Sequence, residues 1–359
     1  FKNNAAHQEL DDGAKLWLYK FKSETAYSLQ FYFDKFYLPS GAKLFFYNSD
    51  KSMLLGAFTD KNNTADKKFL TQPIKGNEIT IEYYEPANSV TEMHIFRVIH
   101  DFVGFFEKSG PYGNSGPCEV DVNCPEGYGW EEEARAVSLI LIYDNSSNLQ
   151  GTCSGSLLNN QLQNGAPYYL TAQHCFDESP PNNDCVLGGI NDIDPAYTVY
   201  MFNHQTGYCN GDDTVAPTSM SITGATILVN GAGTDYAWLE LNTTPPSSYN
   251  VCYAGWDNTN SLPTSPVTGI HHPSGDVKKI SRENAAVTLV DNPISCASTW
   301  TNTHWQVADW DVGSTAGGSS GSPLFNSDHR VIGSLSLVYS KTKTGVGWIC
   351  LRMMTGRGL

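Results

Sequence analysis

The front of this chain contains no cysteine: none of the nine in its 359 residues lies before Cys118. No two of them form a CxxC pair, which argues against a zinc knuckle and against a thioredoxin-type redox site. Spacings this wide suit disulfides made in an oxidising, extracellular compartment. Because the count is odd, at least one cysteine lacks a partner within the chain. The others are Cys124, Cys153, Cys175, Cys185, Cys209, Cys252, Cys296 and Cys350.

Long apolar runs are also missing. No stretch of about 18 apolar residues occurs, so we predict no transmembrane helix and no membrane partner. The chain begins at Phe1 without a methionine or a signal-peptide pattern, so we expect its natural start to have been trimmed or lost.

Positive charge is scarce, above all in the second part of the chain. Residues 1–110 carry 13 Lys and Arg against 14 Asp and Glu, a net of −1, whereas residues 111–359 carry 9 against 23, a net of −14. An acidic body disfavours nucleic acid and would attract basic peptides, although solubility explains the excess equally well.

The length and the composition along the chain predict two domains and a linker. Residues 1–108 alternate apolar and polar residues between turn clusters, which indicates a β-sandwich-like domain. The Gly, Pro and Ser residues of 109–117 indicate an exposed linker and a cleavage site. Residues 118–359 form the second domain. The strands expected in the front domain are 16–21, 27–33, 43–48, 78–84 and 93–100.

The second domain also has strand patterns and little helical periodicity. Glycine and proline interrupt it throughout, which favours antiparallel barrels over a βαβ arrangement. The clearest expected strands are 135–143, 167–172, 197–203, 235–242, 251–256 and 331–339.

A run of small residues from Gly313 to Phe325 reads GSTAGGSSGSPLF. Gly317, Gly318 and Gly321 permit positive φ angles and a close approach of the backbone. A loop built from them can aim several N–H groups at one point beside a serine hydroxyl, as the stabilisation of an oxyanion requires. Such a run is by itself more typical of a surface loop, so its interpretation depends on a histidine and a buried carboxylate elsewhere.

Two upstream residues are candidates for those roles. His174 ends the strand-like run YYLTAQH, and a bridge between the following Cys175 and Cys153 would fix the backbone around the imidazole. Asp235 enters an apolar strand, so its carboxylate is expected to be partly buried and to need a partner. Each residue alone is better explained by a structural role. Together with Ser320 they occur in the order histidine, aspartate, serine.

In this order the three stretches resemble the trypsin-like serine proteases of the chymotrypsin fold. TAQHC resembles their histidine motif, DYAWLEL their aspartate strand and GSSGSPLF their nucleophile loop. More narrowly, the blocks CEVDVNCPEG, CSGSLLNN, YAGWD, IHHP and GGSSGSPLF resemble the bacterial lysyl endopeptidase family, over about residues 115–336. The resemblance implies an all-β double six-stranded antiparallel β-barrel, its last strand or helix expected to be missing, behind a β-rich pro-region.

The resemblance also implies a catalytic role for each residue. Ser320 attacks the scissile carbonyl, His174 takes its proton and Asp235 orients the imidazole. The N–H groups of Gly318 and Ser320 form the oxyanion hole.

Two competing motifs are weaker. Ser319 fits the GxSxG nucleophile elbow of another hydrolase fold, but that fold places its acid and histidine after the serine, where this chain has only His329. The pair His271-His272 lacks the helical HExxH context of a zinc site, so a turn or core role is expected for it. We predict no metal and no cofactor.

The residue before the nucleophile departs from the animal enzymes. There an aspartate pairs with a newly freed amino terminus, whereas this chain has Ser319, so activation by that route is not expected. In the lysyl endopeptidase family disulfides near the mature start would hold that segment instead. The pairs considered are Cys124–Cys209, Cys118–Cys350 and, more weakly, Cys252–Cys296, with Cys185 left without a suggested partner.

The family pattern stops after Ser336. Leu337 and Val338 stand where the family has a glycine pair that binds the substrate backbone, and no Asp or Glu follows Asp328 to line a lysine pocket. Two interpretations stay open: a truncated or frame-shifted tail, or divergence with altered or lost specificity.

The function implied is a secreted, monomeric serine endopeptidase that acts on proteins or peptides and not on nucleic acid. Its pro-domain would be removed near Lys108–Ser115, and its preference for lysine is in doubt because of the tail. Two alternatives stay open: an impaired homologue kept as a binding or adhesion module, and an esterase that uses the same triad.

Overall fold

The computed structural model describes residues 2–102, 104, 115–143, 149–176, 193–213, 216–231, 234–259, 261–291, 303–341 and 345–351, with side chains for all of these except 149–150 and 337–351. The chain divides into two compact units, Phe1–Pro111 and Tyr112–Leu359. This division falls within the 109–117 stretch. Strands predominate in the described parts of both units, and no helix described there is long and apolar enough to cross a membrane.

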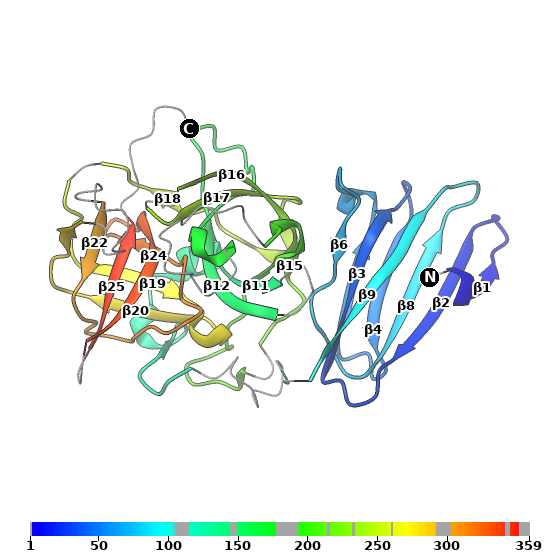
Figure 1. Cartoon of the computed structure of the whole chain (residues 1–359), viewed down its shortest axis with the longest axis horizontal. Coiled ribbons are helices and arrows are strands. Elements are labelled where there is room, and N and C mark those ends of the chain that lie inside the picture. The colour runs from blue at the N-terminus through cyan, green and yellow to red at the C-terminus, as the bar shows by residue number, and fades with distance from the viewer. Residues whose placement is uncertain are drawn as a thin grey trace. The chain divides into compact units, whose positions relative to one another are not determined.

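The front unit consists of antiparallel strands in two sheets (Figure 1). Its strands are β1 (Ala6–Glu9), β2 (Lys15–Lys22), β3 (Ser28–Tyr37), β4 (Lys43–Asn48), β5 (Leu54–Phe58), β6 (Phe69–Leu70), β7 (Ile74–Lys75), β8 (Glu78–Glu85) and β9 (Glu92–Asp101). One sheet has the order β1-β2-β8-β4-β5. In the other, β3 pairs with β6, β7 and β9.

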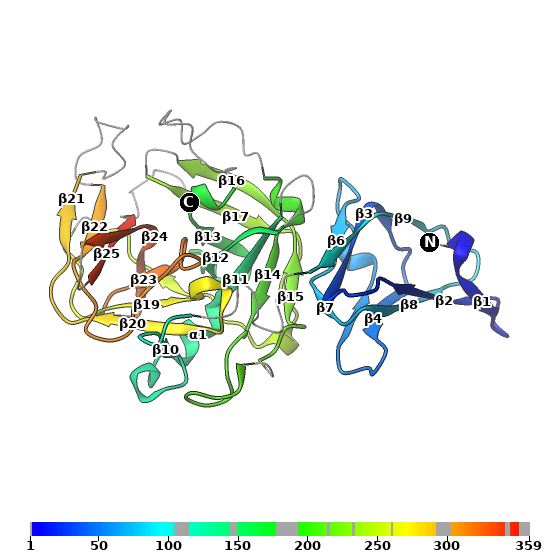
Figure 2. The same cartoon turned by 60° about the horizontal axis from the view of Figure 1, so that its bottom comes forward.

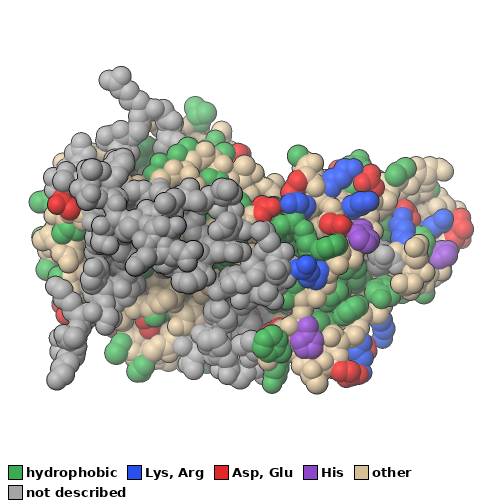
Figure 3. Space-filling view, viewed as in Figure 1, with side chains coloured by type: hydrophobic (Ala, Val, Ile, Leu, Met, Phe, Trp, Pro, Cys, Tyr) green, Lys and Arg blue, Asp and Glu red, His purple; other side chains and the backbone are tan. Residues whose placement is uncertain are grey.

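The alternation of apolar and polar residues determines which side of each strand faces inward. Phe31 and Phe33 of β3 are buried, as are Ile81 and Tyr83 of β8, and all four belong to one hydrophobic cluster with Phe46 of β4. The two sheets therefore share one core. Burial of each such side chain stabilises the unit by roughly 1.5–3 kcal/mol. On the face shown in Figure 3, acidic and basic side chains of this unit are interspersed.

The rear unit contains two larger sheets and the short helix α1 (Glu131–Ala136). Its strands are β10 (Val120–Asp121), β11 (Val137–Tyr143), β12 (Leu149–Leu157), β13 (Tyr168–Thr171), β14 (Val199–Phe202), β15 (Ser221–Thr223), β16 (Ala225–Gly231), β17 (Tyr236–Leu241), β18 (Gly255–Trp256), β19 (Val267–His271), β20 (Lys279–Glu283), β21 (Thr288–Val290), β22 (His304–Val307), β23 (Pro323–Phe325), β24 (Arg330–Lys341) and β25 (Gly345–Leu351).

The first of these sheets has the order β15-β14-β11-β12-β13-β17-β16, and each neighbouring pair is antiparallel (Figure 2). The second has the order β10-β20-β19-β23-β24-β25-β22-β21, with β18 added in parallel to β24. Most strands that follow one another in the sequence therefore pair in the same sheet, as in antiparallel all-β folds.

Three hydrophobic clusters fill the rear unit. One lies within the first sheet, around Tyr200 and Leu239, and one within the second, around Trp305. The third joins the two sheets, since it contains Leu170 of β13 together with Phe325 of β23. The segments that carry the candidate catalytic residues border on this junction: one follows β13, one precedes β17 and one precedes β23.

The all-β class and the construction from two antiparallel sheets agree with the sequence-based expectation. The described sheets contain seven and nine strands, more than six each, because two-residue pairings such as β10 and β18 extend the second sheet. The residues after Ser336 continue β24 and then form β25, which pairs with β24 and β22. A strand is therefore present where the tail was expected to lack one.

Candidate active site

The nucleophile loop, residues 313–322, precedes β23 and turns sharply on both sides of Ser320. Gly318 has φ +93° and Gly321 has φ +79°. A Cβ atom on Gly318 would lie 2.8 Å from a backbone carbonyl oxygen, and one on Gly321 would lie 2.1 Å from a threonine hydroxyl. Only glycine fits these two positions. Gly317 differs, because its φ is not positive and no atom lies within 4 Å of its Cβ position.

Backbone and hydroxyl groups of both sheets hold this loop. Ser154 of β12 donates its hydroxyl to the Gly318 carbonyl (2.9 Å) and its N–H to the Ser320 carbonyl (2.8 Å). From the second sheet, the Leu335 carbonyl accepts the Gly321 N–H (2.7 Å). The serine is therefore fixed between the two sheets before any substrate binds.

His174 and Asp235 lie at the ends of β13 and β17, two neighbouring strands of the first sheet. His174 lies in the 3₁₀ turn Gln173–Phe176 directly after β13, and Asp235 lies directly before β17. The His174 N–H donates to Asp235 Oδ1 (2.9 Å), and its Nδ1 lies 2.7 Å from Oδ2. Since an ionised carboxylate only accepts, Nδ1 carries the proton and Nε2 is left as a base.

Burial differs between the two partners. Asp235 is 1% exposed, whereas the His174 side chain is 33% exposed, so the imidazole extends from a buried carboxylate toward solvent. Asp235 adopts φ +53°, a left-handed conformation that aspartate tolerates better than most residues. Its carbonyl accepts the Gln173 N–H as well, so side chain and backbone both hold the histidine turn.

Ser336 is a second residue that donates to the Asp235 carboxylate, and the sequence did not reveal it. It lies on β24, is 2% exposed and donates its hydroxyl to Asp235 Oδ2 (2.6 Å). No motif marks it, because its role depends on where the strand of the second sheet passes Asp235. The nearest signal in the sequence is its position at the end of the family resemblance.

His304 is a second histidine near Asp235. It is buried on β22, and its Nδ1 lies 2.8 Å from the Thr303 hydroxyl. Burial lowers its pKa to about 4, although the charge of Asp235 acts in the opposite direction. Because His304 is neutral, it does not compete with a protonated His174 for the negative charge of Asp235.

The nucleophile loop contacts the loop that carries His174. The Ser320 carbonyl oxygen lies 4.0 Å from the sulfur of Cys175, the next residue after the histidine. Within the described part of the chain, the N–H groups of Gly318 and Ser320 donate to no other group, whereas the Ser319 N–H donates to the Ala316 carbonyl (3.1 Å). Both N–H groups expected in the oxyanion hole are thus available.

The ligand atoms of Cys153, His174 and Cys175 lie close enough together to hold a metal ion. Both sulfurs belong to the Cys153–Cys175 disulfide, whose Cα atoms are 6.3 Å apart, so neither can act as a thiolate ligand. The bridge fixes the backbone beside the imidazole, as the sequence predicted.

The chain also matches a known protein family. The family model described as lysyl endopeptidase, C-terminal domain, matches residues 112–344. The chain belongs to this family. The lysyl endopeptidase of Pseudomonas aeruginosa is 28% identical over 300 residues, which are 80% of this chain and 59% of that protein. The chain thus spans less than two thirds of the length of this relative.

Solved structures of proteases are also similar to this member of the lysyl endopeptidase family. The active form of the Rv3671c protease from M. tuberculosis has 13% identity and a TM-score of 0.41, covering 67% of this chain and 87% of that one. The protease Anisep from Arthrobacter nicotinovorans has 16% identity and a TM-score of 0.40, covering 62% and 91%.

The disulfides of this lysyl endopeptidase family member agree in part with the expected pairs. Cys124–Cys209 is formed. Cys118 and Cys252 are in no disulfide, so the Cys118–Cys350 and Cys252–Cys296 pairs are wrong. The Cys252 sulfur instead lies 3.1 Å from the Arg135 guanidinium.

Cys350 lies on β25, which pairs with β24 and β22. Cys185 and Cys296 lie outside the described residues.

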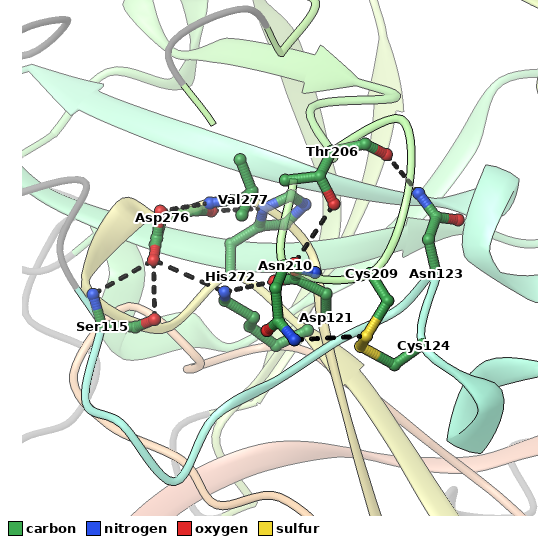
Figure 4. A network of polar contacts seen from close by, with 11 residues as sticks. Ser115, Asp121, Asn123, Cys124, Thr206, Cys209, Asn210, His272, Asp276 and Val277 are labelled. Atoms are coloured by element: carbon green, nitrogen blue, oxygen red, sulfur yellow. Dashed lines mark hydrogen bonds and ion pairs between the residues drawn. A yellow bond between two sulfur atoms is a disulfide. The ribbon is translucent and has the colours of Figure 1, made fainter. Parts of the chain in front are cut away.

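The amino-terminal segment of the rear unit is held by buried carboxylates (Figure 4). The Ser115 N–H and hydroxyl both donate to Asp276 Oδ2, at 3.1 and 2.6 Å. Lys279 forms ion pairs with both Asp276 and Asp121. Asp121 also accepts the Asn210 N–H (2.9 Å), next to the Cys124–Cys209 disulfide. These hydrogen bonds and ion pairs hold the described start of the rear unit in place.

Proposed function

We propose that the rear unit is a serine endopeptidase that hydrolyses peptide bonds through an acyl-enzyme, with Ser320, His174 and Asp235 as its catalytic residues. The observation that carries the proposal is the Nδ1–Oδ2 hydrogen bond of 2.7 Å between His174 and Asp235, beside a glycine-bent serine loop. Membership of the lysyl endopeptidase family supports the same chemistry.

The reaction begins when Ser320 Oγ bonds to the scissile carbonyl carbon and His174 Nε2 takes the hydroxyl proton. The carbonyl oxygen becomes an oxyanion, which accepts hydrogen bonds from the N–H groups of Gly318 and Ser320, worth about 3 kcal/mol for each donor. Asp235 stabilises the imidazolium. The C–N bond then breaks, and the imidazolium gives its proton to the leaving amine.

Water completes the cycle. It attacks the acyl-enzyme carbonyl while His174 takes its proton, and the C–O bond to Ser320 breaks to release the new carboxyl group. Asp235 remains ionised throughout and keeps Nδ1 protonated, so the same imidazole acts as base and acid in both halves of the reaction.

A fluorophosphonate probe tests the assignment of the nucleophile. The full chain should become labelled at Ser320, as mapped by peptide mass spectrometry, and Ser320→Ala and His174→Ala should abolish labelling. Ser319→Ala should keep the adduct at Ser320. Folded protein that takes no label, or takes it at Ser319, would overturn the assignment.

We propose further that the substrates are peptide segments of proteins and that cleavage occurs after lysine. The name of the P. aeruginosa relative, lysyl endopeptidase, supports this preference. Profiling with a peptide library settles the residue preference. Cleavage of small esters without cleavage of any peptide would contradict endopeptidase activity, and cleavage without enrichment of lysine would contradict the lysine preference alone.

The front unit is proposed to be a pro-region of a secreted enzyme, removed near Lys108–Ser115; residues 108–114 of that stretch lie outside the described residues. Cleavage after Lys108 would suit self-processing by an enzyme with a lysine preference. Intact-mass measurement and amino-terminal sequencing test this. A chain that stays uncut while it is fully active would count against removal, and processing of Ser320→Ala at the wild-type rate would count against self-processing.

A further inference from the structure

A chain of buried hydrogen bonds connects the residue before the nucleophile to a histidine outside the triad. His271 lies at the end of β19, is fully buried, and its Nδ1 lies 2.8 Å from the Ser319 hydroxyl. Its Nε2 lies 3.0 Å from the hydroxyl of Ser281 on β20. Both serines are fully buried as well. The proposed catalytic mechanism uses none of these three side chains.

The direction of each hydrogen bond follows from the atoms at the ends of the chain. Ser281 has one hydroxyl proton and uses it in a hydrogen bond to the Ser314 carbonyl (2.6 Å). Its oxygen must therefore accept a hydrogen bond from the Nε2–H of His271. A neutral imidazole protonated at Nε2 has an unprotonated Nδ1, which therefore accepts from the Ser319 hydroxyl. The Ser319 oxygen in turn accepts the Ala316 N–H (3.4 Å).

Both ring nitrogens of His271 thus have a hydrogen-bond partner, and both ends of this chain of hydrogen bonds return to the nucleophile loop. One end reaches the loop at Ser319, and the other reaches it at Ser314, through Ser281. Burial, with a smaller effect from the Lys279 charge, lowers the pKa of His271 to about 3. The ring therefore stays neutral at any pH at which a histidine base operates, and the pattern of donors does not change.

Building on the proposed triad, we propose that His271 is a positioning residue that fixes the nucleophile loop, so that the Gly318 and Ser320 N–H groups point at the oxyanion. A neutral hydrogen bond between Ser319 and an internal histidine takes the place of a charged pair between an aspartate and a new amino terminus. Because His271 lies on β19 and its second partner, Ser281, lies on β20, this contact does not depend on cleavage of the chain.

Ser319→Ala removes the hydroxyl while changing little volume. We expect kcat on the preferred library peptide to fall about tenfold or more, with KM within about twofold, because misdirected N–H groups weaken transition-state binding. The second-order rate of fluorophosphonate labelling should fall in parallel. A folded Ser319→Ala variant with wild-type kcat and labelling rate would overturn the proposal.

Two replacements of the histidine separate its two contacts. In His271→Asn the side-chain oxygen can take the place of Nδ1 and accept from Ser319, so this variant should retain more kcat than His271→Gln, whose amide reaches toward Ser281. The opposite order, with both variants folded, contradicts the assigned directions. His204→Asn is the matched control, since His204 is also buried but bonds the Pro217 carbonyl (3.1 Å). It should lower the unfolding temperature without lowering kcat.

A readout that does not depend on activity separates this proposal from the proposed function. Nitrogen-15 NMR of histidine-labelled full chain should show His271, assigned by its loss in His271→Asn, as the Nε2–H tautomer without titration between pH 5 and 9. The Nδ1–H tautomer would overturn the hydrogen-bond directions even in an active enzyme. A wild type that neither labels nor cleaves, yet shows the expected tautomer, would instead overturn the proposed function.

Discussion

The Ser336 hydroxyl donates a 2.6 Å hydrogen bond to Asp235 Oδ2, the same oxygen that faces His174 Nδ1. The aspartate directly precedes β17 of the first sheet of the rear unit, and the serine lies on β24 of the second. Asp235 is thus held from both sheets, and its Oδ2 accepts two hydrogen bonds.

Removal of either group should affect kcat more than KM. Asp235→Asn loses the ionised acceptor, and we expect kcat to fall by about four orders of magnitude. Ser336→Ala leaves the charge but loosens its orientation, with an expected loss of about tenfold, comparable to one modest hydrogen bond in the transition state. Steady-state kinetics on one peptide measure both. An unchanged kcat in folded Ser336→Ala would show that His174 alone orients the carboxylate.

Gly321→Ala should destabilise the rear unit, because its Cβ would lie 2.1 Å from Thr171 Oγ1 at a φ of +79°. We expect a loss of about 3 kcal/mol in the free energy of unfolding, measured with urea, since steric overlap and a strained φ act together. Gly317→Ala is the control, expected within about 0.5 kcal/mol of wild type because its Cβ position is open. Equal stability of the two variants would contradict the loop geometry.

The two disulfides should differ in what their removal does. Loop-closure entropy predicts a loss of about 3 kcal/mol for Cys153–Cys175, with a separation of 22 residues, and about 4.5 kcal/mol for Cys124–Cys209, with 85. Paired serine replacements and urea unfolding test the order. Only the first bridge adjoins His174, so its loss should also lower kcat in protein that is still folded. An equal effect on kcat from both pairs would contradict this division.

Glu119 should make stability depend on pH. Burial raises its pKa from 4.5 to about 7; Asp276 acts in the same direction, while Lys279 and the Ser314 N–H oppose the shift. Between pH 4.5 and 7 the folded protein therefore binds more protons than the unfolded chain, and stability falls as the pH rises through that window.

Glu119→Gln cannot ionise and should remove this loss. We expect a higher unfolding temperature than wild type at pH 8 and a similar one at pH 4. Glu132→Gln is the control, because the Glu132 side chain is 81% exposed on α1 and should leave the pH profile unchanged. A Glu119→Gln profile parallel to wild type from pH 4 to 8 would argue against the raised pKa.

Much of the fold could be predicted from period-two alternation, and the missed strands show its limit. Strands β4 and β8 match the expected ranges because their apolar residues face one shared core. β12 was missed because its buried side chains are small and partly polar, such as Ser154 and Ser156. The strand expected at 251–256 is reduced to β18, since the rest of that segment adds only the isolated bridge at Ala254.

The candidate catalytic residues could be proposed because each lies in a local motif, whereas the groups that hold them could not. His271 was expected to have only a turn or core role, although the structure bonds it to Ser319. Ser336 was taken only as the end of the resemblance. Both contacts join residues from different strands, at separations that depend on how the sheets pack, which no local pattern reports.

The register of β24 bears on two properties of the proposed protease, the support of its catalytic residues and its choice of peptide. The described bonds from this strand to the nucleophile loop and to Asp235 come from Leu335 and Ser336, and the departure from the family begins at the next residue. A slip of one residue would turn the Ser336 side chain to the opposite face and remove both supports at once. If the proposed function holds, we therefore expect substitutions beyond Ser336 that keep this register to alter the choice of peptide while the proposed catalytic residues stay in place.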